Sequence, residues 1–299
     1  MYWSIIFILL LILLMAFGFY LSGIVIRPRT RSRENTLKTE CEKGNMQREA
    51  FDRLPKEEVR IKSRFGYELH GYYFPNGNSK KTVIICHGIT YTIYGSVKYM
   101  EMFMKRGFNV LIYDHRNHGE SGGDNTTFGY YEKHDLTTCT DWVLERCGSD
   151  CIVGLHGESM GAAIVLQNIA IDPRIVFCVA DCPFSDLTML LDYRLKMEFK
   201  LPSFPAMQLT SLFTRLRTGM SPKAISPMSD IADVKTPVFF IHGKEDRYIP
   251  AQMSMDMYNI KKGIRKLYLA PNSRHAESVV MNREEYDRQV GDFLKEIGL

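Results

Sequence analysis

The sequence predicts an α/β protein: a mostly parallel sheet of about eight strands with helices on both faces and a small helical cap. Three observations predict this class. Short apolar runs recur along residues 59–299, amphipathic helical stretches separate them, and loops of small residues follow several of the runs. Because parallel strands need long crossovers, strands that alternate with helices favour a parallel sheet covered on both faces. The length of 299 residues suits one large domain with an insertion.

The N-terminal segment contains no charged residue from Trp3 to Ile26. About 20 apolar residues suffice for a helix to cross the hydrocarbon core of a membrane. A secretory signal peptide is the alternative, but the apolar run is longer than a typical signal core and has no basic leader and no small-x-small cleavage site. We therefore expect residues 1–26 to form a transmembrane anchor.

The basic residues near this segment all follow it, as Arg27, Arg29, Arg31 and Arg33. The positive-inside rule then predicts a single-pass protein whose C-terminal domain faces the cytoplasm. The opposite orientation stays open, because one helix gives the rule little to average over. These four arginines account for the whole excess of 38 basic over 34 acidic residues, so nothing indicates a nucleic-acid partner.

Residues 27–58 are polar and charged, which predicts a linker that ends in a short helix around residues 47–54. The seven cysteines are odd in number and lack the paired spacing of a zinc site or a disulfide framework. We expect reduced thiols, mostly buried, and no metal bound by them.

The domain begins at residue 59 with alternating residues typical of a strand. A turn at Phe65-Gly66 joins the strand at 59–63 to one at 68–74, which predicts a hairpin. The short apolar run at 82–86 is typical of a buried parallel strand. Further strands are expected at 109–113, 152–156, 175–180, 238–241 and 266–269, and helices at 96–106, 133–147, 160–171 and 284–297. Ligands on such sheets bind beyond the carboxyl ends of the strands.

Residues 157–161 read Gly-Glu-Ser-Met-Gly, with Ser159 at the centre. A Gly-x-Ser-x-Gly pattern occurs by chance in about one chain in ten of this size. Whether it marks a nucleophile therefore depends on the secondary structure around it. Here the pattern follows an apolar strand and precedes a helix-forming run, as a nucleophile elbow requires. The glycines leave room for a tight, strained turn. We therefore predict that Ser159 is a nucleophile.

A serine hydroxyl is a weak nucleophile, so a base must take its proton and an acid must orient the base. Asp246 follows the strand at 238–241, and His275 follows the strand at 266–269. Both therefore lie on loops at the carboxyl ends of strands, in the order Ser, Asp, His. We predict a triad of Ser159, Asp246 and His275.

Other acids and histidines of the chain are alternatives for the same roles. For the acid, Glu245 is adjacent, and Asp181 and Asp186 follow the preceding strand. For the base, His87, His156 and His242 each end a strand, but none follows the acid in the chain, so we interpret them as structural.

The oxyanion formed by nucleophilic attack needs two backbone N–H donors. One is expected from the residue after the nucleophile and one from the loop after the third strand, which gives Met160 and Ile89. Ile89 follows His87-Gly88, where glycine permits close approach of the backbone.

Residues 185–230 fit neither a strand nor a simple crossover. They are rich in Met and Phe and contain Pro202 and Pro205, which predicts a small helical cap over the active site. The apolar side chains either pack internally or form a wall that suits an acyl chain or an aromatic ester.

Residues 59–299 resemble the α/β-hydrolase superfamily, in particular bacterial serine esterases and prolyl-oligopeptidase-like hydrolases with an N-terminal anchor. Besides the triad, the resemblance rests on His87-Gly88, on His242-Gly-x-x-Asp246 and on residues 114–121. The last segment is similar to a structural turn of the family, Asp-x-Arg-x-x-Gly-x-Ser. The turn accounts for the ligand-like side chains of Asp114, His115, His118 and Glu120, so we expect no metal and no cofactor.

The resemblance implies a hydrolase of carboxylic esters or thioesters that works through an acyl-enzyme on a small or lipid-like acyl substrate. A prolyl-oligopeptidase-like peptidase is the alternative, although no propeller precedes the domain and no site for a peptide amine is recognisable. From another class, the chain could be a membrane-tethered binding protein on a retired hydrolase fold. Retired members usually lose a triad residue, and all three are present here.

Overall fold

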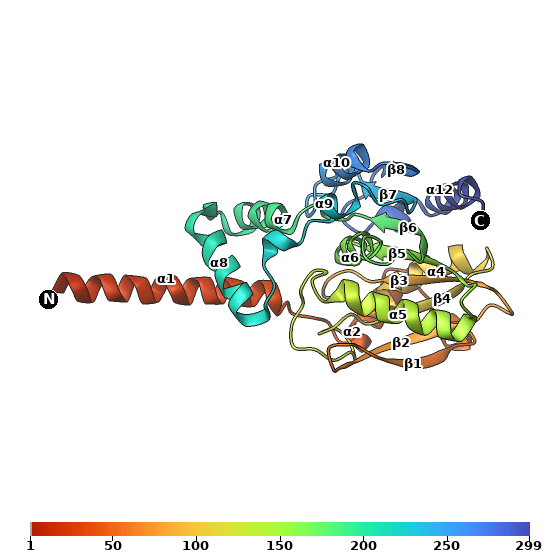
Figure 1. Cartoon of the computed structure of the whole chain (residues 1–299), viewed down its shortest axis with the longest axis horizontal. Coiled ribbons are helices and arrows are strands. Elements are labelled where there is room, and N and C mark those ends of the chain that lie inside the picture. The colour runs from red at the N-terminus through yellow and green to blue at the C-terminus, as the bar shows by residue number, and fades with distance from the viewer. Residues whose placement is uncertain (1) are drawn as a thin grey trace.

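The computed structural model describes residues 2–299, which form one eight-stranded sheet between two layers of helices, with a long N-terminal helix that projects away from them (Figure 1). The strands are β1 (Glu57–Lys62), β2 (Glu68–Phe74), β3 (Lys81–Cys86), β4 (Asn109–Tyr113), β5 (Ile152–Glu158), β6 (Ile175–Asp181), β7 (Val238–Gly243) and β8 (Arg265–Ala270). Their order in the sheet is β1-β2-β4-β3-β5-β6-β7-β8. Strand β2 is antiparallel to both neighbours, and β3 to β8 are parallel. The predicted fold class is confirmed.

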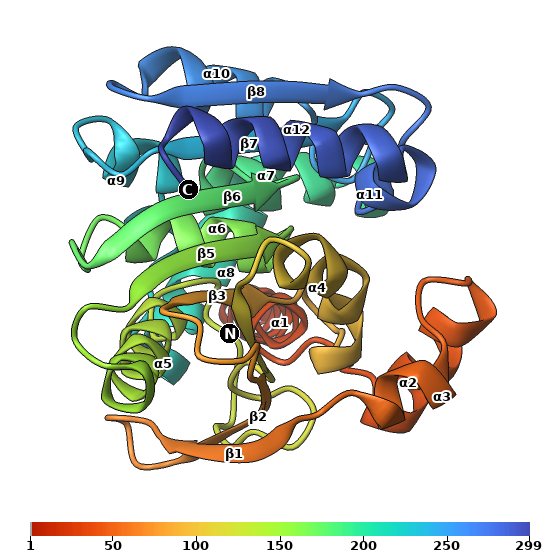
Figure 2. The ribbon, with the colours of Figure 1, turned by 90° about the vertical axis from the view of Figure 1, so that its right-hand side faces the viewer.

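Helices cover both faces of the sheet (Figure 2). Helices α4 (Val97–Met104) and α12 (Arg283–Glu296) pack on one face, where they share a core with buried side chains of β3, β4, β6 and β7. Helices α5 (Glu132–Cys147), α6 (Met160–Asn168), α9 (Pro227–Ile231) and α10 (Gln252–Ile260) contribute to the core of the other face. Because β3 to β8 are parallel, their carboxyl ends meet along one edge of the sheet.

Each predicted strand is present, and its ends lie within two residues of the prediction. The buried strands were predictable because every side chain of β4 and β7 is buried, which gives an uninterrupted apolar run. The short helix α11 (Ser278–Met281) was not predicted, because four residues show no helical period.

Helix α1 (Tyr2–Ile26) is long and apolar enough to cross a membrane, as either an anchor or a signal sequence. Residues 2–16 are exposed, whereas the side of the last third that carries Gly18, Leu21, Ser22 and Ile26 is buried against the rest of the chain. At the end of the helix, the carbonyl of Ile26 accepts a hydrogen bond of 2.8 Å from the N–H of Thr126 in the domain. The apolar helix is thus joined to the domain by packing and by the backbone.

The segment at 27–58 is more ordered than the predicted linker. It contains helix α3 (Arg48–Arg53), close to where a short helix was expected, and helix α2 (Arg33–Glu42), which was not expected. The Ser32 hydroxyl caps α2 by accepting a hydrogen bond from Asn35 N–H at 3.1 Å. The buried residues of α2, Thr36 and Glu40, are polar, and its apolar contacts with the core come from the partly buried Leu37 and Cys41, too few to form a helical period in the sequence.

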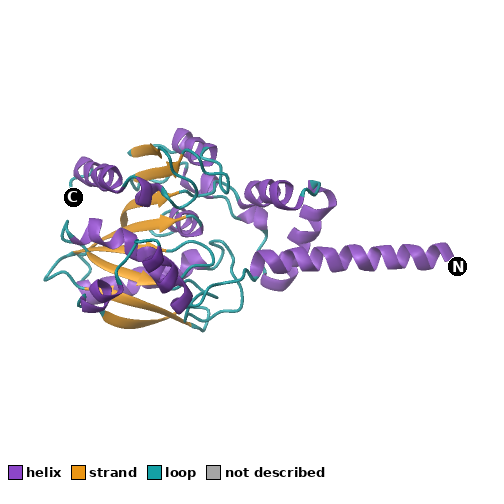
Figure 3. Cartoon of the chain, turned by 180° about the vertical axis from the view of Figure 1, so that it is seen from behind, coloured by secondary structure: helices purple, strands orange, loops and turns teal. Residues whose placement is uncertain are grey.

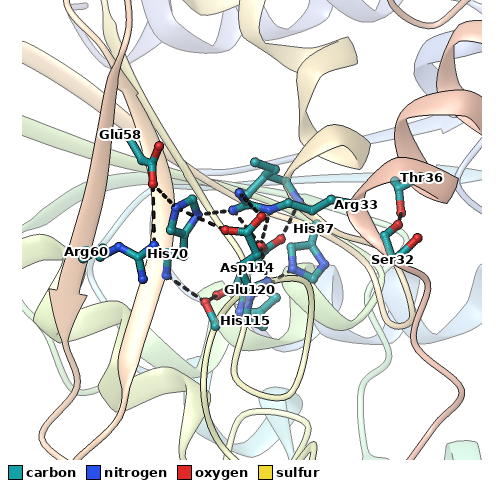
Figure 4. A network of polar contacts seen from close by, with 12 residues as sticks. Ser32, Arg33, Thr36, Glu58, Arg60, His70, His87, Asp114, His115 and Glu120 are labelled. Atoms are coloured by element: carbon teal, nitrogen blue, oxygen red, sulfur yellow. Dashed lines mark hydrogen bonds and ion pairs between the residues drawn. The ribbon is translucent and has the colours of Figure 1, made fainter.

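Arg33 ties α2 to the sheet (Figure 4). Its guanidinium donates to Asp114 Oδ2 at 2.8 Å and also contacts His70 Nδ1. Asp114 is buried, and its oxygens also accept from the N–H groups of Ile93 and Glu120 at 2.8 and 3.0 Å. Burial raises the pKa of Asp114, although Arg33 and the two amides oppose the shift. The predicted linker is therefore a fixed connection between α1 and the domain.

The inserted segment at 185–230 is helical. It contains α7 (Leu187–Arg194), a π-helical turn (Leu195–Phe199), α8 (Ser203–Thr218) and α9. Helix α8 lies alongside the last third of α1 (Figures 1 and 3). Together with the π-helical turn, the two helices share a small apolar core of Leu21, Leu195 and Ala206, to which Phe17 and Met207 add. No local pattern of residues predicts that the cap and the N-terminal helix pack together.

Candidate active site

Ser159 lies on the sharp turn between β5 and α6. Its backbone has φ 56° and ψ −115°, a conformation that costs free energy for any residue but glycine. A Cβ atom on Gly157 would lie 2.4 Å from the Gly161 carbonyl oxygen, and one on Gly161 would lie 2.2 Å from the Cys86 carbonyl oxygen. Both glycines are therefore required by close backbone contact, as the sequence predicted for an elbow.

The structure brings the three predicted residues into one chain of hydrogen bonds. Ser159 Oγ lies 2.8 Å from His275 Nε2, and His275 Nδ1 lies 2.7 Å from Asp246 Oδ2. Ser159 and Asp246 are buried, whereas the His275 side chain is partly exposed. With Nδ1–H donating to Asp246, Nε2 is left to accept the proton of Ser159.

The Asp246 carboxylate is held by hydrogen bonds on both oxygens. Oδ1 accepts from the N–H groups of Tyr248 and Ile249 at 2.8 and 2.9 Å, and Oδ2 lies 3.2 Å from His242 Nε2 besides its contact with His275. Burial by itself would raise the pKa of Asp246, but the hydrogen bonds from His242 and His275 outweigh burial and lower the pKa well below its usual value. Asp246 is therefore ionised at neutral pH.

The other acids considered for this role lie elsewhere. Asp181 Oδ2 accepts from the Tyr99 hydroxyl at 3.2 Å, and burial, helped by the charge of Glu158, raises the pKa of Asp181 to about 6. Asp186 caps α7 by accepting from Met189 N–H at 3.0 Å. Of the candidate acids, Asp246 is the one hydrogen-bonded to His275.

The three strand-end histidines make structural contacts. His87 Nε2 accepts from His115 N–H at 3.0 Å, and His156 Nε2 lies 3.0 Å from the Tyr286 hydroxyl. Burial lowers the pKa of His87 to about 4 and that of His156 to about 3, so both are neutral at pH 7. His242 contacts Asp246 and so supports the acid rather than the nucleophile.

Of the two predicted oxyanion donors, Met160 belongs to the elbow itself and Ile89 belongs to the loop after β3. Met160 is the first residue of α6, so its N–H has no acceptor within the helix. Across residues 2–299, no loop or turn backbone hydrogen bond uses the N–H of Ile89 or Met160. The loop of Ile89 is fixed at Thr90, whose N–H donates to His118 Nε2 at 3.2 Å and whose carbonyl accepts from Arg31 N–H at 2.9 Å.

One cluster has ligand atoms close enough for a metal ion: those of Cys182, Asp246 and His275 lie within 4.8 Å of one another. Two of the three are hydrogen-bonded to each other. Burial, the largest effect, raises the pKa of the Cys182 thiol well above its usual value, so the thiolate that a metal needs is disfavoured. The oxygens of Asp114 are taken by Arg33 and backbone amides. Neither set of donors fits a metal site.

One cavity is lined by Asp246 and His275, and a second cavity shares the lining residue Tyr248 with it. The first, of about 750 Å³, is open and polar, and it is lined by Lys244, Glu245, Asp246, Arg247, Tyr248, Arg274 and His275. The second, of about 280 Å³, is bounded by α1, the cap and the loop of Ile89. Tyr248 lines both cavities, and its ring centroid lies 4.8 Å from that of His275.

Two contacts at the site were not predicted. Lys98 is buried on α4, 2.5 Å from Glu158 Oε2, and its ammonium group donates to the carbonyl of Ala276 at 3.3 Å. The Arg194 guanidinium of the cap lies 3.8 Å from the centroid of the Tyr248 ring. The sequence shows Lys98 as one polar residue of an amphipathic helix, whereas Tyr248 could have been suspected from its place two residues after the acid.

The sheet order, the elbow and the positions of Ser159, Asp246 and His275 define an α/β-hydrolase. The family model described as serine aminopeptidase, S33 matches residues 77–226, and the chain belongs to this family. The matched segment contains Ser159 and ends before Asp246 and His275.

Relatives and solved structures agree with this assignment. The chain is 38% identical to the uncharacterized protein YqkD of Bacillus subtilis over 281 residues, which cover 93% of this chain and 92% of YqkD. The esterase Pf2001 of Pyrococcus furiosus superposes with a TM-score of 0.69 at 29% identity, over 85% of this chain and 95% of that one. Est1E of Butyrivibrio proteoclasticus, solved with ferulic acid bound, shares the fold at 19% identity, with a TM-score of 0.67 over 80% and 98% of the two chains.

Proposed function

We propose that this protein is a serine esterase that cleaves carboxylic esters or thioesters through an acyl-enzyme. The observation that carries the proposal is the hydrogen-bonded series of Ser159, His275 and Asp246, with Ser159 raised on a strained elbow. Such a series lets an otherwise weak hydroxyl act as a nucleophile at neutral pH.

In the proposed reaction, Ser159 Oγ attacks the carbonyl carbon while His275 Nε2 takes its proton. The oxyanion is bound by the N–H groups of Ile89 and Met160, and the charge of Asp246 stabilises the protonated imidazole. His275 then protonates the leaving alcohol or thiol as the tetrahedral intermediate collapses to an ester on Ser159. A water molecule, deprotonated by His275, attacks this ester, and collapse releases the acid and restores Ser159.

The family description and the similarity to Pf2001 point to different leaving groups. The family is described as a serine aminopeptidase family, whereas Pf2001 is an esterase. An aminopeptidase must bind the cationic amino group of its substrate. The open cavity presents the cationic Lys244, Arg247 and Arg274, and the charge of Asp246 is already engaged by histidines, so Glu245 alone remains to bind a cation. These charges favour the esterase.

The proposal is tested by replacing Ser159 with Ala and measuring hydrolysis of p-nitrophenyl butyrate together with labelling by a fluorophosphonate. We expect both to disappear. The control is Ser229→Ala, because Ser229 is exposed on α9 and its hydroxyl contacts only Ser226 among the described residues. Labelling that survives in a pure Ser159→Ala protein would refute the nucleophile.

Parallel assays with aminoacyl p-nitroanilides separate the peptidase from the esterase. Turnover of these amides at a rate comparable to the esters would favour the peptidase. Folded wild-type protein that neither hydrolyses esters nor reacts with the fluorophosphonate would favour the third alternative, a binding protein on a retired fold.

We further infer that α1 is an uncleaved membrane anchor with the domain on the cytoplasmic side. The support is the exposure of residues 2–16, whose apolar side chains no part of the domain covers, and the basic residues that follow the helix. Protease added outside intact cells should leave the domain intact. Digestion of the domain under those conditions would reverse the orientation.

A further inference from the structure

We propose that the apolar cavity between α1 and the cap binds the acyl chain of the substrate, so that the anchor helix forms one wall of the active site, and that the substrate is a single-chain lipid ester that enters from the membrane. This inference rests on the proposed esterase function and on the anchor. It adds to them a binding site, a substrate class and a second role for α1.

The cavity is built by three parts of the chain that are distant in sequence. Helix α1 contributes Leu21, Ile24 and Val25 to its wall, and the cap contributes Leu191 and Met207. The loop that carries Ile89 contributes the third part of the wall. The volume of about 280 Å³ lies near the lower end of the range of about 300–1,000 Å³ that is typical of ligand pockets. It therefore suits one acyl chain rather than a larger lipid.

The cavity is lined by two residues that lie next to the proposed reacting groups. Ile89, whose N–H is the proposed oxyanion donor, lines its wall, and so does Tyr248, whose ring lies against His275. A chain in the cavity therefore has its carboxyl end near the oxyanion donor, while the polar cavity on the other side of Tyr248 remains for the leaving group.

Charged groups at the cavity do not oppose an apolar chain. Arg194 pairs with Glu198 and lies over the Tyr248 ring, so its charge is compensated. Arg29 is exposed at the end of α1 and can remain in water. The remaining lining side chains are mostly aliphatic or aromatic.

The position of α8 along α1 places the cavity at the surface of the membrane. A span needs about 20 residues, so a helix that enters the membrane at Tyr2 leaves it near Leu21. Gly18 and Phe19 lie within that span and contact α8: a Cβ on Gly18 would lie 2.6 Å from Leu209 Cβ, and the Phe19 and Phe213 ring centroids are 5.8 Å apart. Helix α8 must therefore sit at the boundary between lipid and water.

The outer side of α8 has the composition of a helix at such a boundary. Phe204 and Leu216 are 72% and 70% exposed, and Leu212 is also exposed. Arg215 is exposed beside them in the last turn, whereas Arg217 faces α1 and donates to the Phe19 carbonyl and the Ser22 hydroxyl at 3.1 and 2.8 Å. Apolar side chains beside basic ones are typical of helices that lie in the membrane interface. A lipid ester can thus reach the cavity without crossing water.

The test uses the full-length protein in phosphatidylcholine vesicles and compares kcat/KM for p-nitrophenyl decanoate and p-nitrophenyl acetate. Leu191→Trp fills the cavity from the cap, and Ile24→Trp fills it from the anchor helix. We expect each to lower the decanoate-to-acetate ratio at least tenfold. The controls are Met189→Trp, which adds the same ring on the exposed side of α7, and Ile12→Trp, which adds it to the exposed part of α1.

The outcomes separate this inference from the proposed function. If neither cavity variant changes the ratio while acetate is hydrolysed, the acyl site is refuted and the esterase stands. If Leu191→Trp lowers the ratio and Ile24→Trp does not, the anchor helix is not a wall of the site and the inference fails in that part. If Met189→Trp lowers the ratio as much as Leu191→Trp, the effect is not specific to the cavity and the inference is overturned. A wild-type protein that hydrolyses no ester contradicts the proposed function itself.

Discussion

The reaction centre and the cap are built from different kinds of contact. At the reaction centre, Ser159 and Asp246 are buried, and both oxygens of Asp246 have hydrogen-bond partners. Between the cap and α1, a small apolar core around Leu21 and Leu195 is supplemented by hydrogen bonds from the single side chain of Arg217, and large apolar side chains such as Phe204 remain exposed. The geometry of the first region is fixed by directional bonds within the domain. That of the second relies on apolar packing, which is complete only when the exposed side chains are covered.

The largest effect is expected where the charge that orients His275 is removed. Asp246→Asn removes the charge that orients His275 and should lower kcat for p-nitrophenyl butyrate by about 10³- to 10⁴-fold. The control is Glu245→Gln, because the neighbouring Glu245 is exposed and accepts no hydrogen bond from His275 among the described contacts. A fall of less than about tenfold in Asp246→Asn would show that the acid is misassigned.

The next effect concerns the connection between α1, which carries the cap, and the domain. Arg33→Met leaves the buried Asp114 carboxylate without its cationic partner, which should lower the free energy of unfolding by about 3–5 kcal/mol. Arg27→Met, in the exposed part of the same segment, should change it by less than about 0.5 kcal/mol. Denaturant unfolding in detergent micelles measures both. Equal stability of the two variants would mean that the segment at 27–58 is a loose linker after all.

A pH dependence distinguishes two carboxyl groups near the reaction centre. The pKa of Asp181 is raised to about 6, so between pH 4 and pH 6 the folded state keeps a proton that the unfolded state loses, and folding becomes less favourable as pH rises. Asp181→Asn removes this cost, so its stability relative to wild type should increase from pH 4 to pH 6 and then stay constant.

Asp246→Asn should behave in the opposite way. The pKa of Asp246 is lowered, so its contribution to stability is present above pH 4 and is lost as the solution becomes more acidic. The variant should therefore be destabilised more at pH 7 than at pH 3. Thermal unfolding across this pH range measures both variants, and the same sign of pH dependence in the two would contradict the assigned pKa shifts.

The smallest effect is expected in the cap. Gly18→Leu places side-chain atoms where Leu209 and Phe213 now approach α1, so it should push α8 away and lower the decanoate-to-acetate ratio by a few-fold. Hydrolysis of acetate should depend much less on this packing than on Asp246. Gly23→Leu is the control, since a Cβ at Gly23 meets only the flexible end of Arg217, at 3.4 Å. An unchanged ratio in Gly18→Leu would show that the cap acts independently of the anchor.

The sequence by itself determined the class of fold and the candidate triad. Buried parallel strands appear as uninterrupted apolar runs, and the elbow leaves a local pattern because both Gly157 and Gly161 touch backbone atoms. Asp246 and His275 could be predicted because the carboxyl ends of parallel strands meet at one edge, so their order along the chain places them near Ser159.

Only the tertiary structure decided how α1 and α2 relate to that site. Helix α2 buries Thr36 and Glu40, and Arg33 meets Asp114, a residue 81 positions away, so neither leaves a local pattern. The packing of Gly18 against Leu209 is also a contact between distant segments, and an apolar helix alone shows no preference for one partner. Contacts between such distant segments depend on where the whole sheet places its loops. No short stretch of sequence contains that information.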